Sequence, residues 1–266
     1  MKVPRTRRVL LFATAGFAAA VMLAAFVNQH NSGLALATQE ANKQVRQEKD
    51  ERGNIPVAVA AASLPRDPAE RALRLARSSR YDGRGSVTFD EASPNTTGRS
   101  SISEWYLYLP ALPTADSDAV VSGRIVDAKG YLSSDRTGAY SEFTVLIDRV
   151  LKDGRGSLQP GGSVIAEREG AIVNLPDGRL IRYEIAYQGM PQVGRRYVLF
   201  LKYNAPGDDY QILTGYELRD GRVSPVDEAD HFAAYNDSTE ERFLSVVREA
   251  VLHPPQAPRE KQRLIR

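Results

Sequence analysis

One short segment of the sequence combines carboxylates with an imidazole, the side chains that most often bind divalent cations or activate water. Asp227, Glu228, Asp230 and His231 lie close together, and this set of oxygen and nitrogen atoms suits a metal ion or a general acid and base. The spacing matches no established metal-binding loop, and no second histidine is nearby. We therefore interpret the segment as polar residues before a helix, with a hydrolase using Asp227, Asp230 and His231 as the alternative.

Common motifs for catalysis, phosphate binding and zinc binding are missing from the rest of the sequence. There is no G-x-S-x-G, S-x-x-K, G-x-x-x-x-G-K-[ST] or H-E-x-x-H pattern. The chain of 266 residues has no cysteine, which excludes disulfides, thiolate metal sites and a cysteine nucleophile. The three histidines are His30, His231 and His253. We expect no enzyme, no catalytic residue, no cofactor and no metal site.

Aromatic side chains are the best candidates for a binding surface. A dense aromatic and aliphatic run over residues 105–109 ends at Pro110. This run either forms an exposed contact site or packs across the domain that follows it. Packing is favoured, because an exposed patch of this size promotes aggregation. The candidate contact residues are Trp105, Tyr106, Tyr108, Tyr131 and Tyr140.

A short helix is predicted near residues 67–80. Asp67 is a good N-cap, Pro68 suits the first helical position, and Glu70 can return a hydrogen bond to the cap. Three arginines then recur at every third position on one side, namely Arg71, Arg74 and Arg77. We favour a solvated surface for this basic face, and the alternative is a site for anionic lipid or an acidic partner.

Beyond residue 104 the hydrophobic pattern has a period of two, which is typical of β-strands. The segments predicted as strands are 119–126, 140–151, 163–167, 171–175, 179–185, 196–203, 210–218 and 222–226. Turns rich in Gly, Pro and Asp separate them, Gly170 is expected at a bulge or kink, and no long helix interrupts the series. This pattern favours a small antiparallel barrel in a mainly β domain over residues 104–252.

A helix over residues 238–252 is predicted to close this domain. The segment 238–241 (STEE) is a capping-box pattern, and an apolar stripe follows it on one helix face, made by Phe243, Leu244, Val247 and Val251. We expect the stripe to cover one end of the barrel. Residues 253–266 are predicted to be a disordered basic tail.

Residues 118 to about 227 resemble an uncharacterised module of secreted bacterial proteins. The segments that carry the resemblance are 119–126 (AVVSGRIV), 140–145 (YSEFTV), 149–152 (RVLK), 189–191 (GMP) and 193–201 (VGRRYVLFL). Their layout is similar to the small barrels of the oligonucleotide/oligosaccharide-binding (OB) type, including the netrin-like barrels of metalloprotease inhibitors. Those inhibitors use disulfides and an N-terminal cysteine, so their mechanism is not implied for a cysteine-free chain.

The N-terminal region predicts a membrane location. A basic head, residues 1–8 with Lys2, Arg5, Arg7 and Arg8, precedes an uncharged run over residues 9–27. As a helix this run is about 28 Å long, close to the ~30 Å hydrocarbon core, and the basic head should stay in the cytoplasm. Residues 28–103 are predicted to be a stalk, with a flexible linker over 78–103.

We therefore expect a single-pass protein of the bacterial inner membrane whose C-terminal domain is periplasmic or extracellular. The alternative is a secreted protein, cleaved after Ala37 at an A-x-A site. The expected function is a membrane-anchored binding or interaction module with an envelope protein as its partner. A cysteine-free regulator or inhibitor of an envelope protease is the second hypothesis. Nucleic acid is not an expected partner, since basic residues concentrate at the chain ends.

Overall fold

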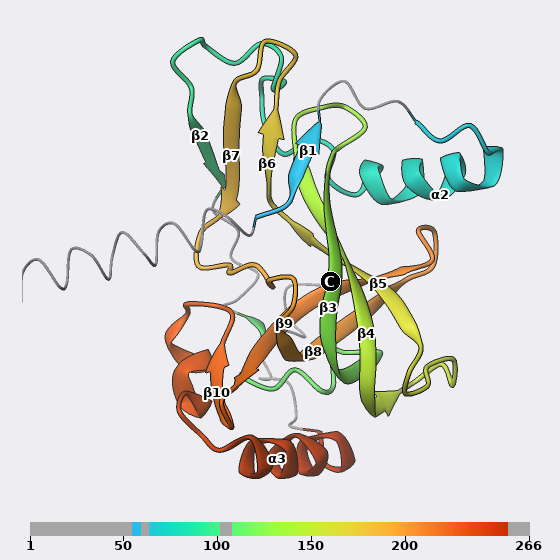
Figure 1. Ribbon diagram of the computed structural model, residues 1–266, viewed down its shortest axis with the longest axis vertical. Coiled ribbons are helices and arrows are strands. Elements are labelled where there is room, and N and C mark those ends of the chain that lie inside the picture. The colour runs from blue at the N-terminus through green and yellow to red at the C-terminus, as the bar shows by residue number, and fades with distance from the viewer. Residues whose placement is uncertain (1–54, 60–63, 102–107, 255–266) are drawn as a thin grey trace, which may run out of the picture. The chain divides into compact units, whose positions relative to one another are not determined.

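The computed structural model describes residues 55–59, 64–101 and 108–254 (Figure 1). All of them belong to one compact unit, Ile55–Arg266. The basic head, the apolar run over 9–27, the cleavage site at Ala37 and the basic tail beyond residue 254 lie outside the described residues. Within the described ranges, no helix is both long and apolar enough to cross a membrane.

The protein is mainly β, with one mixed sheet of many strands and few helices (Figure 1). The strands are β1 (Val57–Val59), β2 (Gly98–Ser101), β3 (Ala119–Leu132), β4 (Ala139–Asp153), β5 (Ser163–Glu169), β6 (Ala171–Asn174), β7 (Leu180–Ile185), β8 (Arg196–Asn204), β9 (Asp209–Arg219) and β10 (Arg222–Pro225). The helices are α2 (Pro68–Ser79), the 3-10 helix η3 (Asp230–Tyr235) and α3 (Glu240–Leu252).

Every strand predicted from residue 119 onward is present. β3 and its partner β4 are the longest strands. β3 extends to Leu132 and β4 begins at Ala139, beyond the predicted ends, because the two strands stay paired up to the loop that joins them. Gly170 separates β5 from β6, as its predicted position at a bulge or kink requires. Its φ of 110° is a conformation that favours glycine.

The strand directions differ from the antiparallel arrangement that the sequence predicts. β1 runs parallel to β3 and β6, β2 runs parallel to β7, and β5 runs parallel to β9. The sequence pattern sets which residues face the core but not the direction of the neighbouring strand. The ladders β3–β4, β4–β5, β5–β9, β9–β8 and β8–β3 form a cycle that returns to its first strand.

β8 lies in the centre of the sheet and is buried on both faces. Leu199 belongs to one hydrophobic cluster, and its neighbour Phe200 belongs to a second cluster on the opposite face. Helix α3 packs on that second face through Phe243, Leu244 and Val247. The apolar stripe of the closing helix therefore covers a face of the sheet and not one end of a barrel, because alternate residues of β8 supply its partner surface.

Part of the predicted stalk packs into the fold. β1 inserts between β3 and β6, and Gly130 of β3 permits this approach because a Cβ there would lie 2.5 Å from the backbone N of Ala58. Tyr81 and Phe89 are 1% and 0% exposed. The linker predicted over residues 78–103 is thus wrong in its described part. Isolated aromatic residues among Ser, Gly and Arg give no periodic signal, although burying them stabilises the fold.

The predicted helix at 67–80 is confirmed as α2. Asp67 is its N-cap, and the Asp67 carboxylate accepts hydrogen bonds from the backbone N–H groups of Ala69 and Glu70. Ser78 is the only residue of α2 that is buried. Polar contacts must therefore hold this helix against the sheet.

Candidate functional site

Helix α2 contacts the sheet through its arginines. The Arg74 guanidinium binds both oxygens of the Glu142 carboxylate on β4, with Nη2 at 3.1 Å from Oε2. Arg77 Nε donates to the carbonyl oxygen of Gly207 at 2.8 Å and lies 3.3 Å from Oδ2 of Asp209. Paired guanidinium and carboxylate groups of this kind give both strength and a fixed orientation.

Arg80, just beyond the helix, completes this set. Its guanidinium pairs with Glu167 on β5 and lies 3.8 Å from Asp209 at the start of β9. The carboxylates of Glu142, Glu167 and Asp209 are 7%, 0% and 0% exposed. The basic helix face therefore does meet an acidic partner, but the partner is the chain's own sheet. The sequence favours a solvated surface for this face, but of its three arginines only Arg71 is exposed to solvent.

A stack of tyrosines lies beside these ion pairs. The guanidinium carbon of Arg74 is 3.6 Å from the centroid of the Tyr131 ring. Tyr131 stacks on Tyr140 with 5.6 Å between centroids, and Tyr140 stacks on Tyr81 at 4.7 Å. This arrangement gains from cation–π and aromatic contacts and fixes the position of Arg74.

Burial governs protonation in this cluster. It raises the pKa of Tyr140 and Tyr131 above the ordinary value, so both hydroxyls stay neutral at physiological pH. Burial alone would lower the pKa of Arg74, but the hydrogen bond and charge of Glu142 raise it. Burial also raises the pKa of Asp209 to about 6, although the charges of Arg80 and Arg77 oppose this shift. Asp209 therefore takes up a proton under mildly acidic conditions.

A groove of about 680 Å³ lies between α2, β1 and the β3–β4 hairpin. Figure 1 shows these three elements next to each other in the upper part of the molecule. Four aliphatic side chains that line the groove are exposed, by 41% to 52%, namely Val57, Val59, Leu64 and Leu75. Among the described residues, the charged side chains that line it are all basic: Arg66, Arg74, Lys129 and Arg136. We call this hollow the α2 groove.

The candidate contact residues fall into different environments. Tyr131 lines the α2 groove, and Tyr140 is fully buried behind it in the tyrosine stack. Tyr108 is 47% exposed and lies outside this groove. Trp105 and Tyr106 lie outside the described residues. The structure therefore brings two of the five candidates together at one site.

The sequence pattern assigns no site role to three acidic residues found here, and it places Asp209 at a hairpin tip. Glu142 and Glu167 stand inside apolar strand segments, and Asp209 precedes the strand of residues 210–218. A carboxylate inside an otherwise apolar strand is the available signal, because an acid at such a position needs a charged partner when it is buried. The arginines that recur on α2 supply the positive charges with which these carboxylates pair.

The acidic segment at residues 227–231 divides between a buried aspartate, Asp227, an exposed one, Asp230, and the half-buried His231. Asp227 is 1% exposed, and its carboxylate accepts hydrogen bonds from Arg168 at 2.8 Å, Thr214 at 2.7 Å and the Gly189 N–H at 3.0 Å. Asp230 is exposed at the start of η3. No group of three or more His, Cys, Asp or Glu side chains among the described residues is arranged to hold a metal ion. Asp227 therefore has a structural role.

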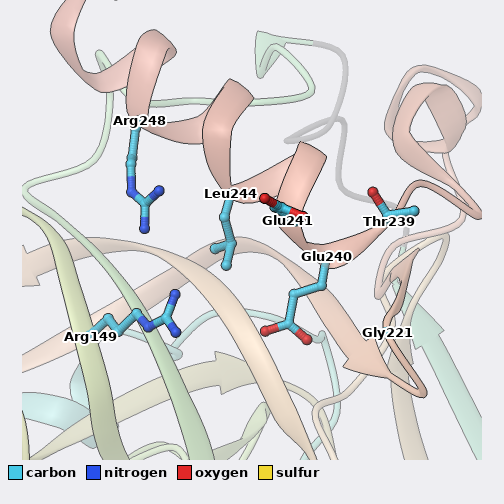
Figure 2. A pocket seen from close by; sticks show the side chains of 7 residues that line it. All are labelled: Arg149, Gly221, Thr239, Glu240, Glu241, Leu244 and Arg248. Carbon is cyan, nitrogen blue, oxygen red and sulfur yellow. The ribbon is translucent and has the colours of Figure 1, made fainter.

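A second hollow, of about 480 Å³, lies where α3 meets the sheet (Figure 2). Arg149 of β4 and Arg248 of α3 stand on one side of it, and Glu240 and Glu241 stand on the other. Glu240 pairs with Arg196 at 3.1 Å. Charges of both signs line this hollow, so it favours no single class of ligand.

No family model matches this chain, and none of the curated proteins matches it in sequence. The geometry of the α2 groove is therefore the basis for assigning a function.

Proposed function

We propose that this chain is a membrane-anchored, extracytoplasmic module that binds a partner protein through the α2 groove. The observation that carries this proposal is the groove itself, where Val57, Val59, Leu64 and Leu75 expose aliphatic surface. Soluble domains seldom leave several large apolar side chains together in one concavity unless it binds something. The basic head and the apolar run over residues 9–27 support the membrane anchor.

We also propose that the scaffold is a small barrel of the OB or netrin-like type. The cycle of ladders through β3, β4, β5, β9 and β8, with β5 and β9 parallel, supports this assignment. In OB-type barrels, the second and third strands and the adjoining loops form the binding face. Here these strands correspond to β4 and β5, which carry Glu142 and Glu167 beneath α2. Helix α2 then covers that face, and the exposed groove lies at its edge.

Site-specific photo-crosslinking in cells that carry the gene tests the proposed function. A photoreactive amino acid replaces Val59 or Leu75 in the full-length chain, and the matched control carries it at Val193, which is 48% exposed and lies outside the groove. We expect one discrete protein adduct from both groove positions and none from the control. Equal adducts from all three positions, or none from the groove, would contradict the proposal.

The crosslinked partner also decides the second hypothesis. If it is an envelope protease, we expect the purified full-length chain to inhibit or activate that protease in a dose-dependent manner, and a Leu75→Glu variant to lose the effect. A partner that is not a protease leaves a binding module as the function and removes the protease regulator.

A further inference from the structure

The lining of the α2 groove combines apolar surface with charge of one sign. Among the described residues, five aliphatic side chains and Tyr131 line it together with four basic residues and no acidic one. Residues 38–251 as a whole carry more acids than bases. Local charge of one sign attracts ligands of the opposite sign and rejects like-charged ones. Carboxylates outside the lining pair with three of these cations: Glu142 with Arg74, Asp127 with Lys129 and Asp90 with Arg136. The charge open to a ligand is therefore that of Arg66 and of Lys129, whose ion pair is exposed.

The basic residues differ in how firmly they are held. Arg74 is fixed by Glu142 and by its contact with the Tyr131 ring. Lys129 pairs at 3.1 Å with Asp127, and these side chains are 66% and 52% exposed. An exposed ion pair of this kind stabilises the fold very little, so a ligand carboxylate can replace Asp127 at little cost. Arg66 has no acidic partner among the described residues.

On these grounds we propose that the α2 groove binds a segment of a partner protein that carries apolar side chains flanked by Asp or Glu. Its apolar side chains would cover Val57, Val59 and Leu75, and its carboxylates would reach Lys129 and Arg66 at the rim. The groove is concave, with α2 as one wall and the β3–β4 hairpin as the other, and a chain segment can enter it whereas a flat bilayer cannot. This inference rests on the proposed function and specifies its partner.

The absence of cysteine makes a direct test straightforward. Leu75→Cys introduces a single thiol at a side chain that is 41% exposed, and an environment-sensitive fluorophore on it reports on the groove. Val193→Cys carries the same label as a control outside the groove. Two designed peptides serve as probes, one alternating Leu with Glu and the other alternating Leu with Lys. The full-length chain is used throughout, reconstituted in phosphatidylcholine vesicles.

We expect the Leu/Glu peptide to change the fluorescence at position 75 saturably and at least ten-fold more tightly than the Leu/Lys peptide. Lys129→Glu should weaken that binding about ten-fold. Arg219→Glu should leave it unchanged, because Arg219 is 67% exposed and lies outside the groove. The label at position 193 should not respond.

Other outcomes overturn the inference in distinguishable ways. If the Leu/Lys peptide binds the groove as tightly as the Leu/Glu peptide, the proposal of an acidic partner is wrong, and the proposed binding module stands. If neither peptide affects position 75, this inference fails, and crosslinking from Val59 and Leu75 decides separately whether the proposed function stands. If adding phosphatidylglycerol to the vesicles changes the label at position 75 without any peptide, and Lys129→Glu abolishes that change, the occupant is anionic lipid and the inference fails.

Discussion

Asp209 shows how one buried carboxylate couples this protein to pH. Burial raises its pKa to about 6, from an ordinary value near 3.8, despite the nearby charges of Arg80 and Arg77. A raised carboxyl pKa means that the folded protein binds the proton more tightly than the unfolded chain does. The contribution of Asp209 to stability therefore increases as the pH falls from 7 towards 4.

We predict that lowering the pH from 7 to 5 raises the free energy of unfolding of the wild type by about 1 kcal/mol relative to that of an Asp209→Asn variant. Asparagine has the same shape and does not titrate, so the difference between the two proteins isolates this group. Urea unfolding at the two pH values measures it. Identical pH profiles for both proteins would show that Asp209 keeps an ordinary pKa. Asp135 and Asp153 have lowered pKa values, so their effects appear at a lower pH.

Among the elements, β5 and the loop after β10 are joined by a buried ion pair. Arg168 of β5 is 2% exposed, and besides Asp227 it binds the carbonyl oxygen of Gly189 at 2.6 Å. A Cβ at Gly189 would lie 1.8 Å from the carbonyl oxygen of Val226, so only glycine fits at this point. The contact fastens the loop before β8 to the loop after β10.

We predict that Asp227→Ala lowers the free energy of unfolding by about 3–5 kcal/mol, because it leaves the Arg168 charge buried without its carboxylate. Asp230→Ala is the matched control. Asp230 is exposed, so a change within about 0.5 kcal/mol is expected. Chemical denaturation measures both variants. Equal small effects would mean that the ion pair does not stabilise the link between these elements.

Across the whole molecule, the sequence predicts what depends on local pattern. The period of two places β3 to β10, and the cap at Asp67 and the capping-box segment 238–241 place the α-helices of the described residues. The N-cap of α3 is Thr239, one residue later than the box at Ser238 predicts. Strand direction, as in the parallel β5–β9 pair, depends on contacts between distant segments and leaves no local pattern. The same holds for the site: Tyr131 and Tyr140 are identifiable as aromatic candidates, whereas their meeting with Arg74 follows from the tertiary fold.

The segments before and after α2 are the clearest case, because they contribute to the core without a periodic pattern. Ala58, Phe89 and Ala92 belong to the hydrophobic cluster around β6 and β7, and Tyr81 completes the tyrosine stack. Burying one large apolar side chain contributes about 1.5–3 kcal/mol, and the net stability of a domain is only about 5–15 kcal/mol. Losing these segments should therefore remove a large part of the stability.

We predict that a chain beginning at residue 55 unfolds as cooperatively as the full-length protein, whereas one beginning at residue 104 gives a broad transition and poorly dispersed NMR spectra. The shorter chain lacks β1, α2 and β2, and it leaves Glu142, Glu167 and Asp209 without their arginines. Thermal unfolding followed by circular dichroism compares the three chains. A sharp transition at the full-length temperature in the chain from residue 104 would mean that residues 55–103 are dispensable. In that case the α2 groove would not be an integral part of the fold.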